Sequence, residues 1–120
     1  MREVIPLIER KPGSRCCTSA GPGLDPAAAQ ALADDLQILA HPIRLQLLDL
    51  LARSAGQVCV CDLESAVPVK QPTVSHHLRL LREAGLIDCE KQGLWAYYFV
   101  KREAVAALRE RIDVRLQALA

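Results

Sequence analysis

The stretch from Val58 to Leu86, VCVCDLESAVPVKQPTVSHHLRLLREAGL, decides the fold. It contains two helical patterns, Val58 to Ala66 and Gln71 to Ala84, joined by the short break Val67-Pro68-Val69-Lys70. Gly85 stands just after the second pattern, where a glycine commonly ends a helix. Two helices with a tight connection predict a helix-turn-helix, in which one helix supports and the other enters the DNA major groove.

The second helix of this motif has an apolar face and a polar face. At about 100° per residue, Val74, Leu78 and Leu81 cluster on one side, and His77 at its edge is predicted to be a hydrogen-bonded packing residue. The opposite side carries residue types that reach phosphates and base edges. The predicted DNA-binding residues are Gln71, Thr73, Ser75, His76, Arg79 and Arg82, with Lys91 farther along the chain.

Helix start signals and strand-like runs complete the predicted fold. Asp25-Pro26 and His41-Pro42 each place a cap residue before a proline, which predicts two helices, the first running to about Leu39. The strand-like runs are 86–91 and 94–100, with Gln92-Gly93 as the turn, and a last helix is expected over 103–119. A hairpin after a recognition helix is a wing, so the fold class is mainly α with a β-hairpin wing, a winged helix-turn-helix, with Lys91 near the wing tip.

The chain is predicted to have two parts, an N-terminal arm marked by proline and glycine residues and a domain that dimerises. Residues 1–24 contain Pro12-Gly13-Ser14 and Gly21-Pro22-Gly23, and we expect a flexible N-terminal arm there. Residues 25–120 are expected to form the DNA-binding and dimerisation domain. Because a small DNA reader with one recognition helix needs a twofold partner for affinity, we expect a homodimer that uses the first and last helices.

Composition excludes several classes of protein. At 120 residues and a net charge of +1, the chain has the size of one domain, and the charge total points to no polyanionic partner. The segment from Lys70 to Arg102 contains six basic and three acidic residues, whereas the segment from Asp25 to Glu64 contains two basic and six acidic residues. This asymmetry suits a DNA reader. No segment approaches the roughly 18–20 apolar residues of a membrane span, so a cytoplasmic protein without a membrane partner is expected.

The five cysteines indicate a site for soft ions, because an odd number in a cytoplasmic chain argues against a disulfide framework. Cys16 and Cys17 are adjacent in the arm, where they can share a ligand, and Cys59 and Cys61 open the motif. Residues two apart in a regular helix diverge by about 200°, so Cys59 and Cys61 can face one ion only if the helix start is distorted; otherwise one of them is a ligand and the other packs. Cys89 is predicted to be a small buried residue.

Thiolate ligands select As(III), Sb(III), Cd(II), Pb(II) or Zn(II). The adjacent arm cysteines plus one of Cys59 and Cys61 give the three thiolates that satisfy trivalent arsenic or antimony, whereas all four cysteines would suit Cd(II) or Pb(II). The predicted metal ligands are Cys16, Cys17, Cys59 and Cys61, with As(III) or Sb(III) favoured as the inducer and Cd(II) or Pb(II) as the alternative.

Three segments resemble the ArsR/SmtB family of metal-responsive winged-helix repressors: LAHPIRL over 39–45, VCVCDL over 58–63 and QPTVSHHLRLLREAGL over 71–86. The resemblance covers about residues 36–100. It implies a homodimer on an imperfect inverted repeat of double-stranded operator DNA, released when a toxic metal or metalloid ion binds. The CVCDL segment resembles the inducer site of the arsenic and the cadmium/lead branches.

The chain also departs from the family pattern. Many arsenic sensors have a third cysteine where this chain has Glu64, so the missing thiolate must come from elsewhere, and the arm offers Cys16 and Cys17. The family's zinc site in the last helix needs Asp and His ligands, and there is no histidine from Lys101 to Ala120. A redox-sensing repressor and a DNA-binding protein without an effector remain alternatives. An enzyme is not expected, nor is a small organic substrate, because no catalytic thiol motif is present.

Overall fold

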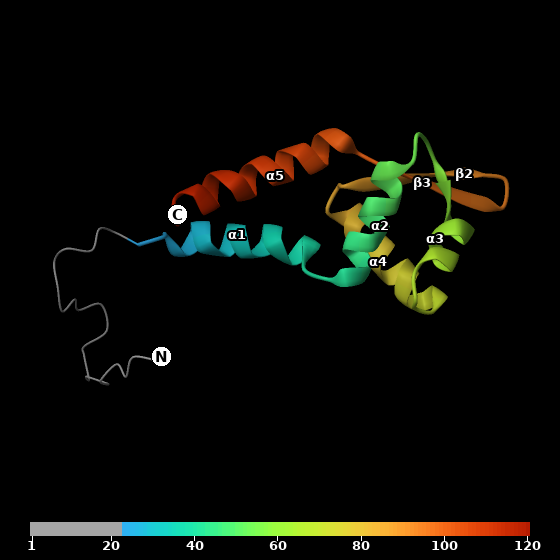
Figure 1. The fold of residues 1–120 in the computed structure, drawn as a ribbon, viewed down its shortest axis with the longest axis horizontal. Helices are drawn as coiled ribbons and strands as arrows, with labels where there is room; N and C mark the ends of the chain where they lie inside the picture. The colour runs from blue at the N-terminus through green and yellow to red at the C-terminus, as the bar shows by residue number, and fades with distance from the viewer. Residues whose placement is uncertain (1–22) are drawn as a thin grey trace.

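A computed structural model describes residues 23–120, and residues 1–22 of the predicted arm, with Cys16 and Cys17, lie outside the described residues. The elements in chain order are α1 (Pro26–Leu39), α2 (Pro42–Arg53), β1 (Val58–Cys59), α3 (Val60–Ala66), α4 (Gln71–Glu83), β2 (Ile87–Gln92), β3 (Trp95–Val100) and α5 (Arg102–Gln117) (Figure 1). The mainly α fold with a β-hairpin wing is therefore confirmed, and α3 and α4 form the helix-turn-helix.

The helix ends follow the local signals in the sequence. The Asp25 carboxylate accepts hydrogen bonds from the amides of Ala27 and Ala28 at 3.1 and 3.4 Å, and His41 Nδ1 accepts one from the Ile43 amide at 3.1 Å. At the end of α4, Gly85 has a positive φ of 80°, and the Leu86 amide bonds back to the Leu81 carbonyl at 3.1 Å. This is a Schellman ending, which needs the left-handed conformation that glycine adopts freely.

The core lies between the two helices of the motif, α2 and the inner face of the sheet. Leu47, Val74 and Leu81 have no exposed surface, and Leu78 is only 1% exposed. The full buried cluster consists of Ile43, Leu47, Leu51, Leu63, Val67, Val74, Leu78, Leu81, Leu86, Ile87 and Leu108. The apolar face predicted for α4 is therefore the face that fixes this helix on the body.

One predicted element is wrong at its start: Val58 and Cys59 are not helical. They form the short strand β1, which pairs antiparallel with β3 through Val58↔Tyr98 and Cys59↔Tyr97. The sheet order is β1-β3-β2, and the β2–β3 pairing continues to Gln92↔Trp95. The wing turn is therefore one residue later than predicted, at Gly93 and Leu94.

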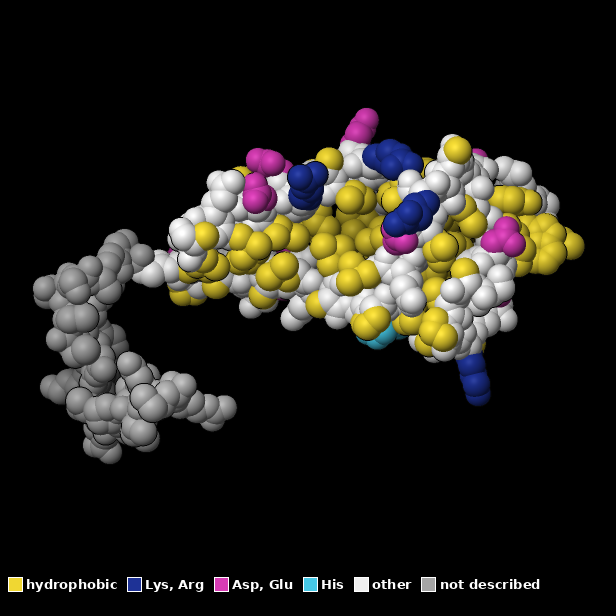
Figure 2. Space-filling view, in the orientation of Figure 1, with side chains coloured by type: hydrophobic (Ala, Val, Ile, Leu, Met, Phe, Trp, Pro, Cys, Tyr) yellow, Lys and Arg dark blue, Asp and Glu magenta, His cyan; other side chains and the backbone are white. Residues whose placement is uncertain are grey.

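Helices α1 and α5 form a pair that extends away from the body. They run antiparallel and side by side (Figure 1), and the Asp35 carboxylate on α1 bridges Arg111 and Arg115 on α5 at 3.2 and 3.5 Å. An apolar groove runs along this pair and past α2, and Figure 2 shows the hydrophobic surface in it. Its apolar lining includes Leu39, Ala52, Val105, Ala106, Ile112 and Leu116, and the charged residues Arg102, Arg109 and Asp113 line it as well. In residues 23–120 no helix is long and apolar enough to cross a membrane.

Candidate DNA-binding face and thiolate site

The outward face of α4 is polar and accessible, as a recognition helix requires. Buried Val74, Leu78 and Leu81 hold the opposite face against the core, so the polar residues between them project to solvent. Six predicted DNA-binding residues lie on α4 and the seventh on β2. All seven side chains are exposed: Gln71, Thr73, Ser75, His76, Arg79, Arg82 and Lys91.

Two of the arginines on this face have partners within the chain. Arg79 contacts the Nδ1 atom of His76 at 3.1 Å and lies 3.9 Å from the Glu83 carboxylate, one turn later. Arg82 donates from Nε to the Asp88 carboxylate at 3.1 Å, across the corner between α4 and β2. The positive charge of Arg82 is thus partly compensated on the protein surface, which the helical wheel did not predict.

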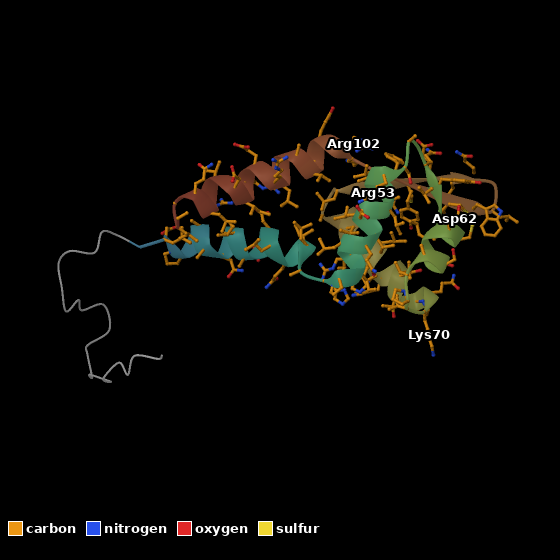
Figure 3. The ribbon with its side chains drawn as sticks, viewed as in Figure 1. Arg53, Asp62, Lys70 and Arg102 are labelled. Atoms are coloured by element: carbon orange, nitrogen blue, oxygen red, sulfur yellow. The ribbon has the colours of Figure 1, made fainter. Side chains whose placement is uncertain are left out.

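Lys70 is a basic residue at this face that the prediction left out. It is the N-cap residue of α4, it is exposed, and its side chain points away from the body (Figure 3). A lysine at a helix N-terminus adds its charge to free backbone amides, a combination that binds phosphate. Lys70 is the last residue of the predicted break between the two helices, so a helical wheel of the residues inside the second helix does not include it.

His77 is a packing residue, as predicted, with 5% of its surface exposed. Its ring lies 4.1 Å from the ring of His41, so it joins the start of α2 to the middle of α4. The hydrogen-bond part of the prediction does not hold at Nδ1, which has no partner within residues 23–120. Burial lowers the pKa of His77, and nearby His41, Arg44 and His76 lower it further.

Cys59 and Cys61 lie side by side at the start of α3. Their sulfur atoms are 2.6 Å apart, although a regular helix would turn them to different sides. The reason is that Cys59 is the extended N-cap residue, with φ −61° and ψ 139°, and only Cys61 is inside the helix. The strand-to-helix boundary between them supplies the distortion that two thiolates need to face one ion.

The surroundings of the pair are open and acidic. Cys61 is exposed and Cys59 half-buried, and Asp62, next in the chain, lies where α3 passes the wing (Figure 3). The hydrogen bond with Cys59 raises the pKa of the Cys61 thiol, so an ion that binds both sulfurs must displace protons. Within residues 23–120 no third metal-ligating side chain joins the pair. Glu64 is half-buried on the same helix.

The third described cysteine, Cys89, lies elsewhere. It is half-buried in β2 opposite Tyr98, which agrees in part with the prediction of a small buried residue. Cys89 therefore offers a matched control for experiments on Cys59 and Cys61.

A helix that buries one face and exposes a polar face, preceded by a supporting helix and followed by a wing, is the arrangement of a winged helix-turn-helix DNA-binding domain. The family model "Bacterial regulatory protein, arsR family" matches residues 41–88. Together with the relatives below, this shows that the chain belongs to the arsR family of bacterial regulatory proteins.

Three comparisons illustrate the relationship. The arsenical resistance operon repressor of Escherichia coli is 48% identical over 64% of this chain and 65% of its own length. That of Staphylococcus xylosus is 35% identical over 66% of this chain and 74% of its own. The homodimeric winged helix-turn-helix DNA-binding domain of a Mycobacterium bovis protein is 31% identical with a TM-score of 0.55, over 82% of this chain and 89% of that structure.

Proposed function

We propose that this chain is a cytoplasmic repressor that binds inverted-repeat operator DNA as a homodimer and is released when As(III) or Sb(III) binds its cysteine thiolates. The observation that carries the proposal is the pairing of the Cys59 and Cys61 sulfur atoms at 2.6 Å, where β1 leads into α3, the helix that supports α4. Relatives named as arsenical resistance operon repressors add support.

The donor set fits a soft ion. Two adjacent sulfurs on an accessible edge can chelate, and As(III) or Sb(III) needs one more thiolate, which Cys16 or Cys17 would supply. If both arm cysteines joined Cys59 and Cys61, the four thiolates would suit Cd(II) or Pb(II), which is the alternative inducer class. The acidic side chain of Asp62 favours a cation beside the pair.

A second copy of the chain is the expected occupant of the groove along α1 and α5. The groove is lined by apolar residues of both helices and of α2, and a relative with this fold is homodimeric. A twofold arrangement presents two copies of α4 to successive half-sites of an inverted repeat. Residues exposed on each α4 would then bind phosphates and base edges of one half-site.

Release follows from linkage between the two sites. Drawing an arm cysteine to Cys59 and Cys61 would shift α3, which packs directly on α4, and so change the position of the recognition helices. A coupling of about 1–3 kcal/mol would lower DNA affinity roughly 5–150-fold.

The test is fluorescence-anisotropy binding to a family-type inverted repeat, titrated separately with As(III), Sb(III), Cd(II), Pb(II) and Zn(II). The variants are Cys16→Ser/Cys17→Ser and Cys59→Ser/Cys61→Ser, and Cys89→Ser is the matched control. We expect As(III) or Sb(III) to release the wild type and Cys89→Ser but neither double variant.

Other outcomes would change the proposal in defined ways. Release only by Cd(II) or Pb(II) would move the protein to the four-thiolate class. Release by peroxide in metal-free buffer, with no effect of any ion, would assign thiol-redox sensing through the same cysteines. No release under any of these conditions would leave a DNA-binding protein without this signal.

A further inference from the structure

Gln57, the residue before β1, holds the outer edge of the wing. Its Nε2 atom donates to the Glu90 carboxylate at 2.7 Å, and its Oε1 atom accepts from the Gln92 side-chain amide at 2.9 Å. The bonds join positions 33 and 35 residues apart in the chain. Lys91, which lies between Glu90 and Gln92, is the wing residue predicted to contact DNA.

The backbone joins the cysteine pair to the same part of the wing. Cys59 pairs with Tyr97 of β3, and Tyr97 pairs in turn with Glu90 of β2. Since successive strand residues point to opposite faces, Cys59, Tyr97 and Glu90 share one face of the sheet. Gln57 lies on that face too and reaches across β3 to β2. The cysteine pair is therefore at the edge of the wing sheet as well as at the start of α3.

A displacement of Cys59 consequently has two routes to the DNA. One passes through α3 to α4, and the other passes through β1 and the Gln57 side chain to the wing. We propose that Gln57 is a positioning residue that couples occupancy of the Cys59–Cys61 site to the orientation of the wing and of Lys91. The inference rests on the proposed function, and it adds the wing as the second element through which ligand binding weakens the DNA complex.

The structure supplies a reporter for this coupling. Trp95 is the single tryptophan of the chain, it is 54% exposed, and it pairs with Gln92 across the wing turn. Its quenching by acrylamide therefore measures wing exposure in the absence of DNA. The reporter also works in the metal-free protein, where loosening of the Gln57 contacts alone should make quenching more efficient.

The single variant changes the charge at position 57, and the double variant exchanges the two side-chain types and restores the net charge of the wild type. Gln57→Glu places a second carboxylate against Glu90. In the double variant Gln57→Glu/Glu90→Gln the one carboxylate, now at position 57, can accept from the side-chain amides at positions 90 and 92. Gln46→Glu introduces the same charge at an exposed position of α2 and is the matched control. For each protein, arsenite is titrated against the DNA complex and, separately, against the free protein with Trp95 quenching as the readout.

We expect arsenite to weaken DNA binding and change Trp95 quenching in the wild type and in Gln46→Glu. In Gln57→Glu the ratio of DNA affinities without and with arsenite should fall about threefold to tenfold, the range that loss of a hydrogen bond gives. The double variant should recover the ratio, which a merely structural role would not predict.

The outcomes separate the two proposals. A wild type that arsenite releases while Trp95 quenching stays constant, or a Gln57→Glu ratio equal to that of Gln46→Glu, would overturn the wing coupling and leave the proposed function standing. A wild type that arsenite does not release would overturn the proposed function and the coupling with it.

Discussion

Asp88 partly compensates the charge of Arg82, one of the predicted DNA-binding residues of α4. Its carboxylate accepts from the Cys89 amide at 2.8 Å and from Arg82 Nε at 3.1 Å, with the two paired side chains about half exposed. The Cys89 amide, with a smaller contribution from Arg82, holds the pKa of Asp88 below its usual range, so this carboxylate is charged at neutral pH. We therefore expect Asp88→Asn to strengthen DNA binding at low salt.

The magnitude follows from counterion release. The substitution keeps an oxygen acceptor for the Cys89 amide and leaves Arg82 uncompensated, which adds one free positive charge per protomer and two per dimer. Each neutralised phosphate contributes about −0.9 to the slope of log affinity against log salt, so the slope should steepen by up to about 1.8. Between about 50 and 200 mM salt the variant should therefore lose about tenfold more affinity than the wild type.

The assay is anisotropy binding of metal-free protein at four or five salt concentrations. Asp49→Asn is the matched control, because Asp49 forms a similarly exposed ion pair with Arg53 on α2, at 2.9 Å, and should leave the slope unchanged. Adding Arg82→Ala to Asp88→Asn should remove the gain. An unchanged slope, or weaker binding at low salt, would refute the reasoning and show that the ion pair holds Arg82 in its DNA-binding position.

Two further predictions concern stability and assembly. The folded-state pKa of His77 lies below its ordinary value near 6.5, so its contribution to stability is present above that pH and lost as the pH falls. In guanidinium unfolding, the free energy of unfolding should therefore decline below about pH 6.5, by at most about 1.4 kcal/mol per pH unit for this proton. The decline should be less steep in His77→Phe. If a second copy covers the groove, Leu116→Glu should raise the dimer dissociation constant measured by sedimentation at least about tenfold, since a carboxylate would be taken out of water in place of an apolar contact. Val114→Glu, on another side of α5, should leave the dimer dissociation constant unchanged. If Val114→Glu weakens the dimer and Leu116→Glu does not, the interface lies on the side of Val114.

The sequence predicted most of the fold because the decisive signals are local. Asp25, His41 and Gly85 each mark a helix end through bonds within a few residues, and the apolar stripe of α4 identifies the face that it buries. These features depend on the backbone and the nearest turn. They are therefore visible without knowledge of the tertiary structure.

The candidate site was less predictable because its geometry depends on distant partners. Nothing in VCVCDL distinguishes a strand from the first turn of a helix, and Val58 and Cys59 are extended because Tyr97 and Tyr98 pair with them. The contacts of Arg82 with Asp88 and of Gln57 with Glu90 likewise form between separate elements. Helical periodicity correctly predicted that the polar residues of α4 are exposed. It could not show which charged and amide side chains form hydrogen bonds within the protein.

The strand-to-helix boundary at Cys59 has two consequences that cannot be separated. If α3 began one residue earlier, the two thiols would point about 200° apart and could not chelate one ion. The same extended backbone at Cys59 pairs with Tyr97, so in this structure the conformation that brings the sulfurs together also joins Cys59 to the wing. A ligand that pulls on Cys59 must then either strain the β1–β3 pairing or move the wing. The second of these outcomes, movement of the wing, is the one that the proposed coupling through Gln57 requires.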